Sequence, residues 1–460
     1  MQRLSGLDAS FLYLETDSQH MHVCSIMDVD TSTMPGGYTF DLLREALSLR
    51  IKAMPEFREK LANSPLNLDH PVWVDDEAFD VDRHLHRIGL PPPGGRAELS
   101  EICGHIASLP LDRRRPLWEM WVLEGVAGTD CHRIAVMSKV HHAGVDGVTG
   151  ANLISRLCAT EADAPAPEPV DGVGGGSGMQ IAAGGLLRFV TRPLQLANVM
   201  PQTVSSVVST VARALEGQTM ARPFAAPPTM FNASINGRRN IAYAQLDLED
   251  IKKVKNHFGV KVNDVVMALV SGVLRQYLVE RNALPDTSLV ATVPVSVHGK
   301  SDRPGRNQVS GMFSSLETQI VDPAQRLEAI AQANSVAKEH SSAIGATLLQ
   351  DWTQFAAPAV FGVAMRVYAR TRLTESLPVH NLVVSNVPGP QIPLYLLGGE
   401  VKAMYPLGPI FHGSGLNITV MSLNGKLDVG LVSCPDLLPD LWEMADEFAV
   451  AMEELLAATS

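Results

Sequence analysis

A stretch rich in proline, glycine and acidic residues divides this 460-residue chain into two parts of unequal length. It begins at Glu161 and continues through the glycine-rich residues 172–178. Such a composition is typical of a linker and not of a packed element. The chain is long enough for two or three domains of roughly 150 residues each. We therefore predict a first domain over residues 1–160, a connecting segment over residues 161–235, and a second domain over residues 236–460.

A pair of histidines follows an apolar stretch near the end of the first part. Residues His132–Val140 favour β structure and partly alternate between apolar and polar, as a half-buried strand does. His141 and His142 come next, and Asp146 follows four residues after His142. The glycines within this segment predict a tight turn, because glycine tolerates backbone angles that other residues avoid. A strand that ends in a tight turn holds its side chains in a defined direction.

This histidine pair suits acyl transfer. A neutral imidazole, with an unperturbed pKa of about 6.5, can take the proton of a hydroxyl that attacks a thioester. We take His142 as the candidate general base and expect His141 to be a packed or surface residue. Asp146 either hydrogen-bonds an imidazole nitrogen or pairs with a distant arginine; we favour the second role. We expect no zinc site, because no Cys-x-x-Cys or His-Glu-x-x-His motif accompanies the pair.

The second part of the chain alternates predicted helices and strands. Residues Val262–Glu280 are apolar on most faces and predict a buried helix, with Asn263 or Asp264 as its cap. Capping and a direct role in the active site remain equal alternatives for these two residues.

Three further elements are predicted downstream of this helix. Residues Leu289–Val297 form a strand whose Pro294 indicates an edge or a bulge. Residues 416–433 form a hairpin, since Asn424-Gly425 supplies the positive backbone angles of its turn. Residues Leu438–Ala457 form the closing helix.

Five segments, in this order, resemble motifs of the wax ester synthase/diacylglycerol acyltransferase family. That family belongs to the CoA-dependent acyltransferases, together with chloramphenicol acetyltransferase and peptide-synthetase condensation domains. The segments are Leu4–Leu12, Arg115–Trp118, His141–Gly147, Val262–Asp264 and Ser385–Pro390. The resemblance runs from residue 4 to about residue 440. It implies an α/β, two-lobed chloramphenicol acetyltransferase-like fold with a tunnel between the lobes.

The resemblance also implies a set of site residues. His142 would be the base, and His141 and Asp146 would complete the catalytic motif. Ser385, at a position resembling the oxyanion serine of chloramphenicol acetyltransferase, and Asn263 are the candidate oxyanion donors; the alternative for Ser385 is a small packed residue. The other motif residues are Gly147, Pro116, Leu117, Trp118, Asp264, Asn386, Pro388 and Gly389.

The implied activity is transfer of a long acyl chain from acyl-CoA, the co-substrate, to diacylglycerol. The product would be triacylglycerol, with wax esters from long-chain alcohols as a further product, and no bound cofactor is expected. Two other classes stay open. A condensation-type enzyme would take its acyl group from a carrier protein and would not use free acyl-CoA. A noncatalytic lipid-binding protein would bind lipid without releasing thiol.

The net charge of −12 argues against a nucleic-acid partner, which would require a basic face. CoA phosphates would need a local basic patch instead. Lys252, Lys253 and Lys255, with Lys261, form one such cluster, although most clusters of this kind are solvated helix faces. Arg113–Arg115 form another, whose structural alternative is ion pairing between the lobes.

Several features bear on where the protein works. The cysteines are scattered and odd in number, which indicates reduced thiols in a cytoplasmic protein. They are Cys24, Cys103, Cys131, Cys158 and Cys434. We expect no signal peptide and no transmembrane helix.

Residues 179–216 mix arginines with bulky apolar residues, which suits a helix lying on a membrane surface. Helices packed across the two domains are the alternative. The inner face of the plasma membrane and the surface of lipid droplets are therefore expected peripheral locations.

Overall fold

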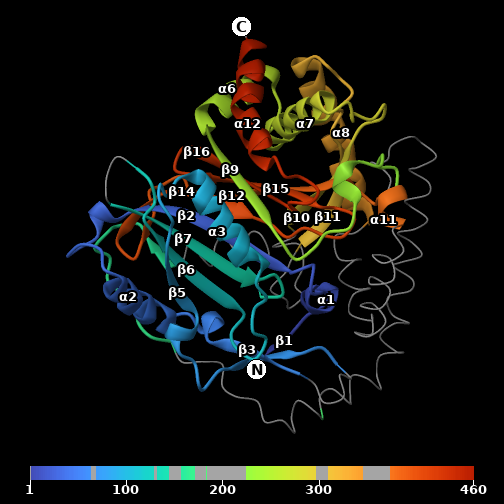
Figure 1. The fold of residues 1–460 in the computed structure, drawn as a ribbon. Helices are drawn as coiled ribbons and strands as arrows, with labels where there is room; N and C mark the ends of the chain where they lie inside the picture. Colours follow the sequence, from blue (N-terminus) through green and yellow to red (C-terminus); the bar gives the residue numbers. More distant parts are fainter. Residues whose placement is uncertain are drawn as a thin grey trace.

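The computed structural model shows two mixed α/β lobes built on two large sheets (Figure 1). The structure describes residues 2–63, 69–128, 132–144, 157–170, 183, 224–296, 309–344 and 373–459. The predictions for residues 179–216, Asp146, Gly147 and Cys131 lie outside the described residues, apart from Ala183. The linker residues that are described, 161–170, form neither helix nor strand.

The first lobe contains a seven-stranded sheet in the order β5-β6-β7-β2-β14-β13-β8. Its strands are β5 (Leu85–Gly89), β6 (Trp118–Glu124), β7 (Arg133–His141), β2 (His22–Asp30), β14 (Gly399–Leu407), β13 (Tyr395–Leu396) and β8 (Cys158–Ala159). A small sheet of β1 (Gln2–Arg3), β4 (Val72–Asp75) and β3 (Glu59–Ala62) lies beside it, near the start of the chain. The helices of this lobe are α1 (Gly6–Leu14), α2 (Phe40–Lys52) and α3 (Arg96–Ser108).

Strand β7 is buried on both faces. Val136 packs with Leu47 of α2, whereas Met137 packs with Ile106 of α3. The prediction of a half-buried strand was therefore wrong. The reason is that α2 and α3 cover opposite faces of the sheet, so even the polar Ser138, Lys139 and His141 of β7 are buried.

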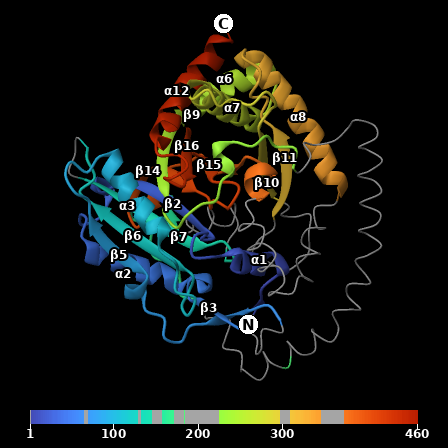
Figure 2. The ribbon, with the colours of Figure 1, turned by 45° about the vertical axis from the view of Figure 1, so that its right-hand side comes forward.

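The second lobe contains a six-stranded sheet in the order β11-β10-β12-β15-β16-β9. Its strands are β11 (Val309–Ser315), β10 (Val290–Ser296), β12 (Leu382–Pro388), β15 (Leu416–Leu423), β16 (Lys426–Ser433) and β9 (Asn240–Asp247). Its helices are α6 (Leu248–Phe258), α7 (Val262–Glu280), α8 (Pro323–Ile344), α11 (Leu373–Ser376) and α12 (Leu441–Ala457). Helices α6, α7, α8 and α12 gather on one face of this sheet (Figure 2).

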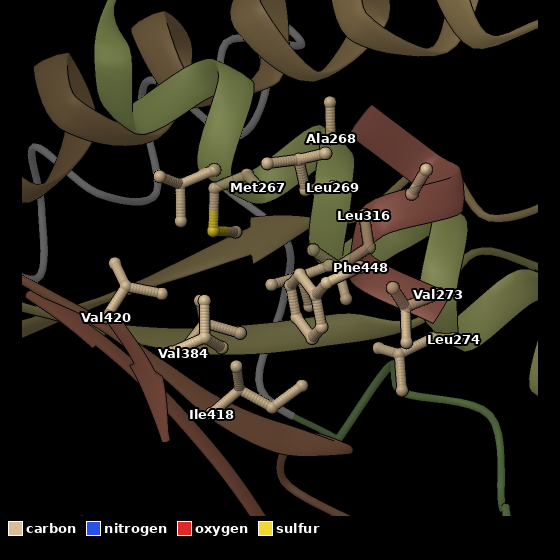
Figure 3. Packing of buried hydrophobic residues seen from close by; sticks show 14 of the residues in the cluster. Met267, Ala268, Leu269, Val273, Leu274, Leu316, Val384, Ile418, Val420 and Phe448 are labelled. Carbon is tan, nitrogen blue, oxygen red and sulfur yellow. The ribbon is translucent and has the colours of Figure 1, made fainter. Parts of the chain in front are cut away.

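The core of the second lobe forms where α7 and α12 meet that sheet. Figure 3 shows Met267 and Leu269 of α7, with Phe448 of α12, above Ile418 and Val384 of the sheet. Alternate residues of each strand point to the other face, as a strand requires. This second face looks toward the first lobe.

The helix predicted over residues 262–280 is confirmed. Within the described residues it is the one helix whose length and apolar composition would suffice to cross a membrane, and 72% of its apolar window is buried in the fold. It is therefore a core helix. Its N-cap is Lys261 rather than Asn263 or Asp264; Asp264 instead accepts a hydrogen bond from the Lys261 backbone N–H at 2.9 Å.

The hairpin over residues 416–433 is also confirmed, with φ of 44° at Asn424 and 80° at Gly425. The closing helix begins at Leu441, three residues later than predicted. Strand β10 is not at the edge, since β11 lies outside it. Pro294 is tolerated there because the ladder between β10 and β12 ends at Thr292, so no N–H is needed toward β12.

The two lobes are not separate along the sequence. Strand β14 follows β12 in the chain, yet Glu400–Leu407 pair with Asp30–Cys24 of β2 in the sheet of the first lobe. At the crossing, the Met404 backbone N–H donates to the Asp428 carboxylate of β16 at 2.7 Å. Strands from the last third of the chain therefore complete the first lobe, and a cut at residues 160 and 235 does not separate the two sheets.

Candidate active site

An apolar cavity of about 350 Å³ lies between the two sheets. Val383, Ser385 and Thr419 line it from the second sheet, on the face opposite the helices. Ser138 and Val140 of β7 line it from the first sheet, with Met404 of β14. The expected space between the lobes is thus present among the described residues.

His142 lines this cavity directly after β7. Its backbone N–H donates to the Met21 carbonyl oxygen at 2.8 Å, which holds the turn against β2. Its imidazole stacks on the Phe11 ring of α1, with centroids 4.0 Å apart and planes 17° apart. The ring of the proposed base therefore has a defined orientation at the wall of the cavity.

His141 points away from the cavity and is fully buried. Its Nδ1 accepts a hydrogen bond from the Ala143 backbone N–H at 3.0 Å, and its Nε2 lies 3.4 Å from a Glu15 carboxylate oxygen. Burial lowers the pKa of His141, although Glu15 opposes this effect. The structure thus places His141 as a packed residue and does not bring it to the cavity with His142.

Glu15 connects the histidine turn to the rest of the first lobe. Its carboxylate lies 3.4 Å from His22 Nε2, receives a hydrogen bond from Arg113 at 2.5 Å, and accepts the Met21 backbone N–H at 3.2 Å. Burial raises the pKa of this carboxyl group, but the nearby His141 and His22 and the hydrogen bond from Arg113 outweigh this effect and hold the pKa well below its usual range. Glu15 is thus a largely buried anion beside the histidine that precedes the proposed base. Sequence reasoning missed it, because these contacts join segments far apart in the chain.

Glu15, His20 and His22 could hold a metal ion by residue type. Their ligand atoms all lie within 4.8 Å of one another. No metal site was predicted from the sequence, whose motifs do not include these three residues. Arg113 already binds the same carboxylate, and its positive charge opposes a cation there.

Ser385 lines the cavity from β12, with Thr419 of β15 as its strand partner. The other oxyanion candidate, Asn263, is not among the lining residues; its Oδ1 accepts a hydrogen bond from Asn386 Nδ2 at 3.5 Å. Asp264 is buried and accepts from Asn334 Nδ2 of α8 at 2.8 Å, besides the Lys261 N–H. Asp264 therefore fixes the start of α7, while Asn263 links α7 to β12.

The remaining motif residues support the strands that carry the site. The Leu117 carbonyl oxygen accepts the His141 backbone N–H at 3.0 Å, and Trp118 Nε1 donates to the Phe57 carbonyl oxygen at 2.8 Å. Pro116 precedes this pair. Pro388 ends β12, and at Gly389 a side chain would overlap the Ser422 carbonyl oxygen.

The two basic patches pair largely with nearby acids. Lys252 and Lys253 bind Glu249 and Asp250 one turn earlier on α6, as on a solvated helix face. Arg114 and Arg115 pair with Asp112, and Arg113 pairs with Glu15. These arginine pairs lie within the first lobe, so the structural alternative of ion pairing between the lobes was wrong. The turn after Arg113–Arg115 returns at once to β6 of the same sheet, which keeps these side chains there.

Fold and site together define a two-lobed acyltransferase of the CoA-dependent group. Residues 4–266 match the wax ester synthase/diacylglycerol acyltransferase catalytic domain, and residues 306–456 match the C-terminal domain of the same proteins. The chain belongs to the wax ester synthase/diacylglycerol acyltransferase family.

Relatives with known names agree with this assignment. The chain is 60% identical to a candidate diacylglycerol O-acyltransferase of Mycobacterium tuberculosis, over 99% of this chain and 90% of that protein. It is similar in structure to the wax ester synthase/diacylglycerol acyltransferase of Marinobacter aquaeolei, with a TM-score of 0.71, 29% identity and full coverage of both chains. The first condensation domain of the calcium-dependent antibiotic synthetase has the same fold, with a TM-score of 0.60 and 16% identity over 99% of this chain and 97% of that one. The expected two-lobed fold is therefore confirmed.

Proposed function

We propose that this protein transfers a long acyl chain from acyl-CoA to diacylglycerol and so makes triacylglycerol, with fatty alcohols as secondary acceptors. The observation that carries the proposal is the position of His142 at the wall of an apolar cavity between the lobes. Such a cavity suits acyl chains, and a histidine at its wall is the one general base that the family motif requires. The name of the Mycobacterium tuberculosis relative favours diacylglycerol as the acceptor.

The chemistry needs no covalent enzyme intermediate. His142 takes the proton from the acceptor hydroxyl as its oxygen attacks the thioester carbonyl carbon. The carbonyl electrons move to oxygen, and Ser385 is the proposed hydrogen-bond donor to this oxyanion. When the carbonyl re-forms, the C–S bond breaks and the CoA thiolate leaves with the proton held by His142. The products are one ester and one free thiol.

We also propose that the protein works at a lipid surface on the cytoplasmic side, because diacylglycerol and triacylglycerol partition into membranes and droplets. Residues 179–216 are the proposed contact. Flotation with liposomes that contain diacylglycerol tests this: the full chain should float, and a chain lacking residues 179–216 should not. Equal flotation of both would refute the assigned segment.

The activity itself is tested by thiol release from palmitoyl-CoA with dioleoylglycerol or hexadecanol, with chromatography of the lipid product. We expect thiol and triacylglycerol in equal amounts, and a higher kcat/KM with dioleoylglycerol. A higher kcat/KM with hexadecanol would make the protein a wax ester synthase. Lipid binding without thiol release would refute the enzymatic proposal, and use of a carrier-bound acyl group alone would indicate a condensation-type enzyme.

A further inference from the structure

His380 is a histidine at the cavity that the proposed chemistry does not use. It lines the cavity just before β12 begins, on the second lobe. Both of its ring nitrogens are buried, and within the part of the chain that the structure describes neither has a hydrogen-bond partner. Buried polar atoms in native proteins are nearly always paired, so this unpaired imidazole beside the cavity is a candidate for contact with a ligand.

The backbone around His380 is fixed on both sides. Its carbonyl oxygen accepts a hydrogen bond from Asn232 Nδ2 at 2.9 Å. The next residue, Asn381, exchanges hydrogen bonds with Val290 at the start of β10, each at 2.8 Å. The backbone that carries the imidazole is therefore held in place on the lobe.

Thr292 of β10 resembles His380 in lining the cavity with an unpaired polar group. Its side chain lines the same cavity, and its Oγ1 is buried without a hydrogen-bond partner in the described part of the protein. Phe313 connects the two sites: it is the strand partner of Thr292 in β11, and its ring centroid lies 6.3 Å from that of His380. By contrast, the hydroxyl of Thr419 in the same cavity donates to Asn417 Oδ1 at 2.7 Å.

The chemistry of these groups suits an uncharged ligand atom. Burial lowers the pKa of His380 to about 4, so the ring is neutral at pH 7. A neutral imidazole offers one N–H donor, and the threonine hydroxyl offers a second. Neither group brings a charge that would favour a phosphate. A carbonyl oxygen can accept from either donor.

We propose that His380 and Thr292 are the polar donors of a subsite for the ester carbonyl oxygens of the acyl acceptor. Of the two acceptor classes, diacylglycerol carries such carbonyls and a fatty alcohol carries none. The subsite would therefore select glycerides over simple alcohols. This inference rests on the proposed function, because it assigns an acceptor group within the same cavity.

A pair of glycerol lipids tests the subsite directly. Dioleoylglycerol carries two ester carbonyls, whereas the dioleyl diether of glycerol has the same free hydroxyl and chains without carbonyls. We expect the wild type to show a kcat/KM about 10-fold higher with the diester, the effect of one good hydrogen bond. In His380→Leu this ratio should fall to about 1, while kcat/KM with hexadecanol stays within about 2-fold of wild type.

Two further variants separate recognition from packing. His380→Gln keeps a side-chain N–H and should retain part of the preference for the diester. Thr292→Val should reduce the preference, whereas Thr419→Val, a matched change at a paired hydroxyl in the same cavity, should leave the ratio unchanged. Activity with hexadecanol shows that each variant is folded.

Other outcomes would overturn the inference. A wild type without preference for the diester, or a His380→Leu variant that keeps it, would exclude an acceptor carbonyl at this subsite. An equal loss with all acceptors and a raised KM for palmitoyl-CoA would assign the subsite to the pantetheine amides of the donor instead. Absence of thiol release by the wild type with every acceptor would refute the proposed function itself, and this inference with it.

Discussion

At the scale of single residues, the charged groups that support the proposed site lie outside the apolar cavity. His142 faces the cavity, while the neighbouring His141 faces the opposite way toward Glu15. One histidine of the motif therefore faces the space where substrates would bind, and the other anchors the turn through a largely buried anion. Alternating side-chain directions at the end of β7 produce this division of roles.

Replacing Glu15 should show how much this anchor stabilises the fold. In Glu15→Gln the positive charge of Arg113 and the two histidines lose their anionic partner, so we expect the free energy of unfolding to fall by about 2 kcal/mol. This value allows for solvent screening at Arg113, whose side chain is 45% exposed. Urea denaturation at pH 7 measures the change. Asp112→Asn, at an exposed ion pair, is the control and should change stability by less than about 1 kcal/mol.

The pH dependence of this variant gives a second check. Because the fold lowers the pKa of Glu15, its stabilisation is complete above the ordinary value of 4.5 and is lost as the pH falls below it. The difference between wild type and Glu15→Gln should therefore shrink in acid. A difference that stays constant from pH 7 to pH 3.5 would show that the Glu15 charge does not contribute.

At the scale of elements, the close crossing of β14 and β16 sets the geometry between the sheets. A side chain on Gly430 of β16 would overlap the carbonyl oxygen of Pro406 in β14. Leu407 and Met404 of β14 line the cavity beside this crossing. The absence of a side chain at one glycine thus determines how near the lobes approach at the proposed site.

Gly430→Ala should therefore destabilise the fold. The added methyl group meets backbone rather than a flexible side chain, so we expect a loss of about 3 kcal/mol or more in the free energy of unfolding. Gly89→Ala is the matched control, since a methyl group there meets nothing within 4 Å. Thermal denaturation should show a Tm several degrees below wild type for Gly430→Ala and a Tm near wild type for Gly89→Ala. Equal Tm values for both variants would contradict the tight crossing.

Local patterns in the sequence predicted individual elements well. The apolar run of Val262–Glu280 and the turn at Asn424-Gly425 each carry their signal within a few residues, and both match the structure. The place of His142 at the cavity and of Ser385 on a strand facing it also followed from local motifs. The role of Glu15 could not be predicted, because its partners His22, Arg113 and His141 meet only after the sheet has formed.

At the scale of the whole molecule, the second lobe completes the first. The pairing of β14 with β2 joins residues almost four hundred positions apart, and no composition or periodicity signals it. The linker-like residues 161–170 therefore mark a break in the chain and not a boundary between independent sheets. The cavity forms because both sheets turn one face toward the same space.

The pKa of Asp428 depends on its burial at this junction between the lobes. Burial raises the pKa of its carboxyl group from 3.8 to about 6. A raised pKa in the fold means that its contribution to stability is complete below pH 3.8 and is lost as the pH rises through 6. Relative to Asp428→Asn, wild type should lose about 2 kcal/mol of unfolding free energy over this range.

Urea denaturation of both proteins between pH 4 and pH 8 measures the effect, and above pH 6.5 the difference should be flat. Asp436→Asn, at an exposed carboxylate, serves as the control and should follow wild type. Parallel curves for wild type and Asp428→Asn would show that Asp428 does not titrate at the junction.

The most direct test of the account is thiol release from palmitoyl-CoA, with dioleoylglycerol as acceptor, by wild type and by His142→Ala. Loss of a general base should lower kcat by about 10²–10⁴-fold, with the KM for palmitoyl-CoA little changed. His105→Ala, which removes an exposed histidine from α3, should keep wild-type rates. Undiminished thiol release by a folded His142→Ala protein would contradict the central claim that His142 is the base.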